Sequence, residues 1–212
     1  MIKRWSGCAI KELKVREPVQ KRAIEKKERI LKCGFKLMCE KGYHSIDCIE
    51  IAKAADVSTG TVYQYFNDKK DIFLQGFEKT MKEILFPIIE YKNQRVKGNV
   101  TRDTVEQLID STVKKHYYHQ KTHREIAAMI QEDKDCAIIF KNFEEEAIQA
   151  MIDTMKVNHI NLPNLTERAH LILNWVDDYC HEKTFHKHKE VDIDVMKKML
   201  IDSIANLLEL KA

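Results

Sequence analysis

Residues 47–73 read DCIEIAKAADVSTGTVYQYFNDKKDIF and predict two short helices separated by a tight turn. Asp47 and Glu50 have the spacing of a capping box, so we expect the first helix over 48–55. Asp56 follows it, and a short polar side chain of this kind tolerates the positive φ that such a turn requires.

Ser58 is expected to cap the second helix, over 59–66. A helix this short is unstable alone and needs a neighbour, which a helix-turn-helix supplies while leaving one face free for the major groove of DNA. That free face carries Thr59, Thr61, Tyr63 and Gln64. Their hydroxyl and amide groups suit hydrogen bonds to base edges and contacts with thymine methyls.

Lys69 and Lys70 stand at the start of the next predicted helix. Two ammonium groups and the positive end of a helix dipole together predict a phosphate site.

The run from Asp56 to Phe73 resembles the signature of the TetR family of transcriptional regulators. Gly42-Tyr43 and the segment 51–55 also fall at that family's spacing, so the resemblance covers about residues 23–73. Asp56 stands where the family usually has Gly, and Ile49 stands where a polar or basic residue is frequent. The resemblance implies a DNA-binding head followed by a helical domain that dimerises and senses a ligand.

The resemblance also assigns roles to single side chains. Tyr65 and Lys69 should contact phosphates, Thr59, Thr61 and Gln64 should read or approach bases, and Tyr63 should lie against the backbone or a base. The expected DNA-contacting set is Ser58, Thr59, Gly60, Thr61, Tyr63, Gln64, Tyr65, Lys69 and Lys70. The alternative is that Val62 and Phe66 pack inward and that Tyr63 or Tyr65 only supports them.

Charge is distributed unevenly along the 212 residues. Residues 1–70 hold 16 Lys and Arg against 9 Asp and Glu, a net charge of +7, whereas residues 71–212 hold 20 against 24, a net charge of −4. Because a polyanion is attracted to the basic third, we expect nucleic acid to meet the amino-terminal end.

The whole chain is predicted to be all-α: a three-helix DNA-binding head with a helix-turn-helix, then a larger carboxy-terminal helical bundle, about nine helices in total. Only 6 Gly and 3 Pro interrupt it, and no segment alternates as a strand would. We expect a basic tail over 1–20, a helix-turn-helix domain over 21–67, and a ligand-sensing and dimerisation domain over 68–212. Pro87 should kink or end the helix expected over 68–91.

The carboxy-terminal part offers two sets of apolar candidates, each of which could equally be ordinary core. For an effector pocket the candidates are His116, Met129, Phe143, Met151 and Trp175. For a four-helix dimer interface they are Ile172, Val176, Tyr179, Met196, Leu200 and Leu207. The last two predicted helices, 166–186 and 192–210, carry apolar residues on more than one face, which a symmetric partner would cover.

Nine histidines include His116, His119 and His123 on one expected helical face, with His181, His186 and His188 further on. Such spacings arise by chance, and no Cys or carboxylate accompanies the first three at ligand spacing, so we expect no metal and no cofactor. The six cysteines show no CxxC pair and are expected to be reduced, mostly as buried small hydrophobes.

The function expected from these features is sequence-specific transcriptional regulation, by a cytoplasmic homodimer on a pseudo-palindromic operator. The expected regulator is a repressor that an unidentified small molecule releases. An enzyme is the first alternative, but the sequence has no nucleophile elbow, phosphate loop or HExxH motif. A non-specific architectural protein is the second, and the net negative charge of residues 71–212 argues against wrapping DNA. No apolar run is long enough for a membrane span, and no signal peptide is expected.

Overall fold

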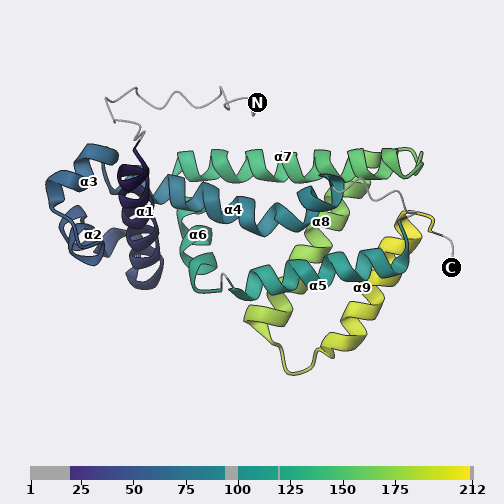
Figure 1. Ribbon diagram of the computed structural model, residues 1–212. Coiled ribbons are helices and arrows are strands. Elements are labelled where there is room, and N and C mark those ends of the chain that lie inside the picture. The colour runs from purple at the N-terminus through teal and green to yellow at the C-terminus, as the bar shows by residue number, and fades with distance from the viewer. Residues whose placement is uncertain (1–19, 94–99, 119, 211–212) are drawn as a thin grey trace. The chain divides into compact units, whose positions relative to one another are not determined.

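A computed structural model describes residues 20–93, 100–118 and 120–210 of the chain. These residues form nine α-helices and no strand, as the sequence predicts (Figure 1). In this described part, no helix is both long and apolar enough to cross a membrane. The five cysteines within it are all reduced, and four of them are buried. The basic tail expected over 1–20 lies almost entirely outside the described residues.

The first compact unit comprises residues 1–76. Its helices are α1 (Lys21–Lys41), α2 (Cys48–Ala54), α3 (Thr59–Tyr65) and the start of α4 (Lys69–Asn93), with a 3₁₀ turn at Tyr43–Ser45. Its fully buried centre consists of Ile30, Met38, Ile46, Ile51, Val62, Phe66, Ile72 and Phe73. The amphipathic helices of this unit therefore close around one core, which fixes α3 by its inner face.

Two glycines allow close packing in this unit. A Cβ at Gly34 would lie 2.9 Å from Cγ2 of Ile72 and 3.0 Å from Cγ2 of Ile51, so α1 passes very near α2 and α4. A Cβ at Gly76 would lie 2.3 Å from Cγ of Phe35. Neither position tolerates a side chain without movement of its neighbours.

The second compact unit comprises residues 77–212. It contains the rest of α4 and five further helices, α5 (Arg102–Tyr118), α6 (Gln120–Glu132), α7 (Lys134–Val157), α8 (Leu165–His181) and α9 (Ile193–Leu207). Helix α7 packs against α6 and α8, and α9 packs against α5 and α8. Lys197 of α9 ties α9 to α5, with Nζ 2.7 Å from Oε1 of Glu106 and 2.8 Å from Oδ1 of Asp110.

Two details differ from the sequence expectation. Helix α4 continues through Pro87 to Asn93, so this proline does not end the helix; a proline removes one backbone donor, and the surrounding helix can absorb that loss. The helix expected over 166–186 ends earlier, at His181, and a π-helical turn follows at Glu182–His186. In addition, the second unit begins inside α4 at Phe77, nine residues beyond the expected start at Asp68.

Candidate DNA-binding interface

Helix α2 begins at a complete capping box. Oδ1 of Asp47 accepts from the backbone amides of Ile49 (2.9 Å) and Glu50 (2.8 Å), and Oε2 of Glu50 accepts from the amide of Asp47 (3.3 Å). The following turn places Asp56 at a φ of 51°. The sequence predicted both features, and both are confirmed.

Helix α3 begins at Ser58, whose Oγ accepts from the backbone amide of Thr61 at 3.2 Å. The hydroxyl groups of the same two residues lie 2.9 Å apart. Val62 and Tyr65 bury the inner face of this seven-residue helix. The cap and the buried face together hold a helix that is too short to persist alone.

The outer face of α3 is open to solvent. Gly60, Tyr63 and Gln64 are exposed, and Thr59 and Thr61 are half-exposed. The pKa of the Tyr63 phenol is raised, chiefly by a hydrogen bond with the thiol of Cys48 and also by nearby carboxylates. The face therefore offers hydroxyl and amide groups with one glycine among them, where another surface can approach the helix closely.

Tyr65 is placed differently from the sequence expectation. Its side chain is only 5% exposed, three residues after the fully buried Val62 and on the same inner face of α3. It therefore packs in the core of the first unit, as the alternative interpretation of the sequence has it, and its contact with a phosphate stays a prediction.

At the predicted phosphate site at the start of α4, the ammonium group of Lys69 binds backbone carbonyl groups of the protein. Nζ of Lys69 donates to the carbonyl oxygens of Tyr43 and Ile46, each at 2.9 Å, and lies 4.6 Å from the centre of the Tyr43 ring. Oδ1 of Asp68 accepts from the backbone amide of Asp71 at 2.8 Å, which caps the helix. Lys69 thus stabilises the segment that precedes α2. The neighbouring Lys70 is half-exposed.

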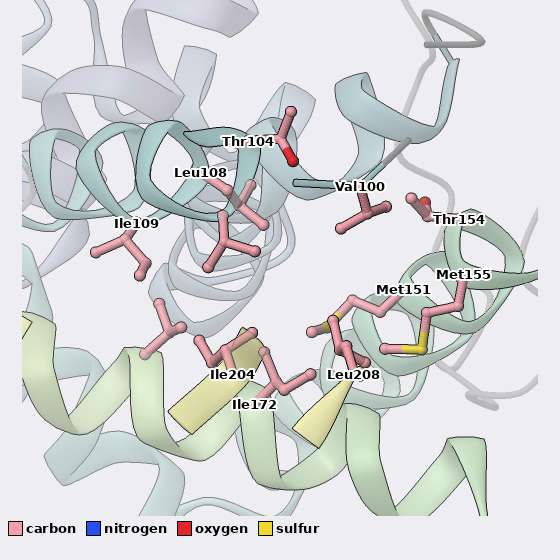
Figure 2. A pocket seen from close by; sticks show the side chains of 12 residues that line it. Val100, Thr104, Leu108, Ile109, Met151, Thr154, Met155, Ile172, Ile204 and Leu208 are labelled. Carbon is pink, nitrogen blue, oxygen red and sulfur yellow. The ribbon is translucent and has the colours of Figure 1, made fainter. Parts of the chain in front are cut away.

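The second unit contains a cavity of about 70 Å³ (Figure 2). Helices α5, α7, α8 and α9 line it, together with Val100. Its walls are Val100, Thr104, Val105, Leu108, Ile109, Met151, Thr154, Met155, Ile172, Val176, Ile204 and Leu208. Only Met151 among the expected pocket residues lies in this wall.

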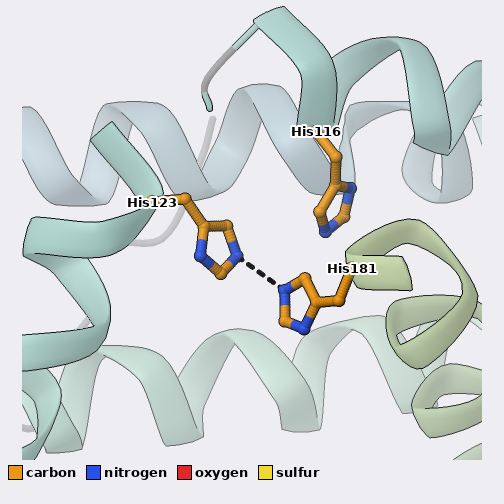
Figure 3. A group of neighbouring side chains, drawn as sticks. All are labelled: His116, His123 and His181. Carbon is orange, nitrogen blue, oxygen red and sulfur yellow. Dashed lines mark hydrogen bonds between the residues drawn. The ribbon is translucent and has the colours of Figure 1, made fainter. Parts of the chain in front are cut away.

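The other expected pocket residues lie elsewhere in the second unit. Met129 and Phe143 are buried, and Trp175 packs at the edge of the core that surrounds the cavity. His116 faces His123 and His181 instead (Figure 3). Helical spacing marked all of these as inward-facing, but it could not say which helices leave a space between them.

The residues expected at a dimer interface are mostly buried within their own chain. Ile172, Val176, Tyr179 and Leu200 belong to the core of the second unit, and Met196 and Leu207 pack partly against it. Different apolar side chains face outward on the same two helices: Leu171 on α8, and Val195 and Met199 on α9, at 42%, 52% and 64% exposure. Which face of α8 and α9 forms a dimer interface therefore stays a prediction.

Two short helices joined by a tight turn, the second with one buried and one free face, define the helix-turn-helix class of DNA-binding domain. Residues 30–76 match the family described as bacterial regulatory proteins, tetR family. Residues 30–76 thus form a helix-turn-helix domain of the TetR type.

Relatives of known sequence match only part of the chain. The transcriptional regulator HbdR of Aromatoleum sp. (strain CIB) is 41% identical over 61 residues, 29% of this chain and 25% of HbdR. The fatty acid metabolism regulator protein of Bacillus subtilis (strain 168) is 31% identical over 89 residues, 42% of each chain. The chain thus spans less than two thirds of the length of these relatives.

Solved structures share the fold over nearly the whole chain. A protein of Mesorhizobium loti MAFF303099 assigned to the TetR family superposes with a TM-score of 0.74 at 16% identity, covering 90% of this chain and 98% of that one. GusR of Salmonella enterica gives a TM-score of 0.70 at 18% identity, covering 91% and 100%. At this level of identity the likeness establishes the fold alone.

Proposed function

We propose that this protein is a sequence-specific DNA-binding transcriptional regulator, and that it has no enzymatic role. The observation that carries the proposal is the free face of α3, where Gly60, Tyr63 and Gln64 are exposed while Val62 on the opposite side is fully buried. A helix held in this way can enter the major groove and place polar side chains against base edges.

The surroundings of α3 support this use. The positive net charge of residues 1–70 favours approach to DNA, and regulators of the TetR family bind DNA operators. We assign the contacts to Ser58, Thr59, Gly60, Thr61, Tyr63, Gln64 and Lys70. Lys69 and Tyr65 act indirectly in this proposal, by holding the segment before α2 and the inner face of α3. A regulator of this kind acts where the DNA is, in the cytoplasm of a bacterium.

Selection from a random duplex library tests the proposal. The full-length chain should enrich one sequence with two related half-sites about one helical turn apart. Gln64→Ala should keep its affinity for phosphates but lose discrimination at one position of each half-site, worth about 1–3 kcal/mol. Failure to enrich any sequence would refute the function, and an unchanged base preference in Gln64→Ala would refute the assigned face.

We further propose a homodimer formed through the outward faces of α8 and α9. Regulators of this family typically act as dimers, and two half-sites require two reading heads. Leu171, Val195 and Met199 supply exposed apolar area on these helices. Covering such side chains with a second copy removes them from water on both chains at once.

The cavity between α5, α7, α8 and α9 is the proposed effector site. Its wall is aliphatic and methionine-rich, with Thr104 and Thr154 as the polar groups, so the effector should be mainly apolar (Figure 2). Two related proteins are named as regulators of fatty acid metabolism and degradation, which makes an acyl chain a reasonable first probe. A ligand of ordinary size needs roughly 300 Å³ or more, so binding must open the cavity, and Met151 and Met155 can move to allow it.

A side chain that fills the cavity should block effector binding without changing the helix-turn-helix. Val176→Phe adds volume to the wall and should cost about 1–3 kcal/mol of stability. The variant should keep its operator affinity, while acyl compounds that stabilise the wild type and release it from DNA no longer act. If Val176→Phe responds to them as the wild type does, the effector binds elsewhere. A ligand that releases the protein from DNA must bind the conformation that cannot bind DNA more tightly than the conformation that can.

A further inference from the structure

Three histidines from three helices converge in the second unit (Figure 3). His116 comes from α5, His123 from α6 and His181 from the last residue of α8, and one ring nitrogen of each lies within 4.8 Å of the others. Nε2 of His123 and Nε2 of His181 are 3.0 Å apart. Segments 58 residues apart in sequence thus meet through their imidazoles.

The groups around the cluster orient two of the rings. Nδ1 of His116 lies 3.1 Å from the carbonyl oxygen of Thr112. In the tautomer that carries its proton on Nδ1, this nitrogen donates a hydrogen bond to that oxygen and Nε2 keeps a lone pair. Nδ1 of His181 lies 3.6 Å from Oδ2 of Asp177. Histidines that bind metals commonly donate their second ring N–H to a backbone carbonyl or a carboxylate, as His116 can to Thr112.

Asp177 brings a carboxylate into the same place. Its Oδ1 lies 3.2 Å from Nε2 of His116, the ring nitrogen turned away from Thr112. A carboxylate oxygen and an imidazole lone pair are both electron-pair donors, and a cation can bridge them. Phe185 in the π-helical turn stacks against His123 and His181, at 5.0 and 5.5 Å between ring centres, and closes one side of the cluster.

We propose that His116, His123 and His181 bind a divalent transition-metal ion of the Zn²⁺ type, with Asp177 as a fourth ligand or as the carboxylate that orients two of the histidines. Imidazole with carboxylate suits Zn²⁺ and its first-row neighbours, and three histidines form a common zinc ligand set. Tetrahedral zinc places ligand nitrogens about 3.3 Å apart, so binding needs only a small closure of the rings. The site is independent of the cavity and of the proposed DNA face.

A second group of possible ligands, Glu182, His186 and His188, is less suited to a metal. Glu182 already accepts from His188 twice, at 2.6 Å through Nδ1 and at 2.6 Å through the backbone amide. Both histidines are exposed to solvent. This group offers a matched control, because the same ring can be removed a few residues away from the proposed site.

Calorimetric titration with Zn²⁺ tests the site, using the full-length chain without a histidine tag after treatment with EDTA. The wild type should bind one ion per chain at micromolar concentration, and its melting temperature should rise with Zn²⁺. Co²⁺ in its place should give the visible absorption typical of four-coordinate nitrogen and oxygen ligation. A wild type that binds no stoichiometric Zn²⁺ would overturn the proposal.

Variants locate the ion. His123→Ala and His181→Ala should lose the stoichiometric site, and Asp177→Asn should weaken it by about 10–100-fold. The double variant His186→Ala/His188→Ala should bind as the wild type does. A cooperative melting transition in EDTA shows that a variant is folded. If a variant does not fold, the Co²⁺ spectrum of the wild type tests whether nitrogen and oxygen ligands bind the ion. Loss of binding in the double variant with retention in His123→Ala and His181→Ala would move the site to the control group and refute the assignment.

Discussion

The contact between Gly76 and Phe35 is the tightest glycine contact in the first unit, since an added Cβ would meet three atoms of Phe35 within 2.6 Å. Phe35 packs against Phe73, so its ring cannot turn away freely. We expect Gly76→Ala to lower the free energy of unfolding by about 1–3 kcal/mol in urea denaturation. An unchanged midpoint would show that this packing is looser than the structure describes.

Lys69 permits a second test at the level of one side chain. Removing its ammonium leaves the carbonyl groups of Tyr43 and Ile46 without their donor, so Lys69→Ala should lower stability by about 1–2 kcal/mol. Lys53→Ala, an exposed position on α2, should change stability by less than about 0.5 kcal/mol.

The salt dependence of DNA binding distinguishes the two roles considered for Lys69. If it fastens the segment before α2, the slope of log affinity against log salt concentration stays as in the wild type. If it contacts a phosphate, as the family resemblance implies, the slope falls by about one unit in Lys69→Ala. The second result would contradict the structural role assigned here.

At the scale of single residues, the helix caps and the turn could be predicted from the sequence. Asp47, Ser58 and Asp56 act within three or four residues of themselves, so the chain order alone determines their partners. The partners of Lys69 and the burial of Tyr65 could not be predicted in the same way. The carbonyl groups that hold Lys69 lie 23 and 26 residues away, and only the assembled unit brings them together.

Among the elements, α3 is the helix proposed to read bases, and a substitution at Gly60 can affect its stability and its DNA contacts in opposite directions. A Cβ there meets nothing closer than Oγ of Ser58 at 3.9 Å, so Gly60→Ala should raise stability by up to about 1 kcal/mol through helix propensity. If α3 lies against DNA, the same methyl should weaken operator binding by at least about tenfold, or 1.4 kcal/mol. Equal or tighter binding by this more stable variant would argue against α3 as the groove helix.

Helix existence was predicted well because apolar residues repeat at helical spacing along the described chain. Which apolar residues of α8 and α9 pack internally was not predicted, since apolar residues stand on more than one face of each helix. The π-helical turn after His181 also carries no periodic signal, because it changes the hydrogen-bonding partner and not the residue types.

For the whole molecule, the proposed assembly depends on Met199, whose side chain is 64% exposed on α9. Met199→Glu would bury an unpaired charge at a dimer interface, so sedimentation should show a monomer at concentrations where the wild type is a dimer. Val157→Glu makes the same change at a position that is 62% exposed at the end of α7 and should leave the dimer intact. A Met199→Glu protein that remains dimeric would place the interface elsewhere.

The cavity and the histidine cluster were beyond the reach of the sequence. Four helices line the cavity and three supply the histidines, so both sites depend on packing among distant segments. His116 and His123, expected on one helical face, lie on α5 and α6, and His181 joins them from α8. The expectation of no metal rested on the chance of such spacings among nine histidines and on the lack of a Cys or carboxylate at ligand spacing.

The affinity of the full-length protein for its selected duplex, compared with a shuffled duplex of the same composition, tests the central claim most directly. Fluorescence anisotropy at one fixed salt concentration suffices. A regulator that reads bases through α3 should prefer the selected duplex by at least about 10³-fold. Equal affinity for the two duplexes would mean that the protein contacts only the phosphate backbone, and it would contradict sequence-specific regulation.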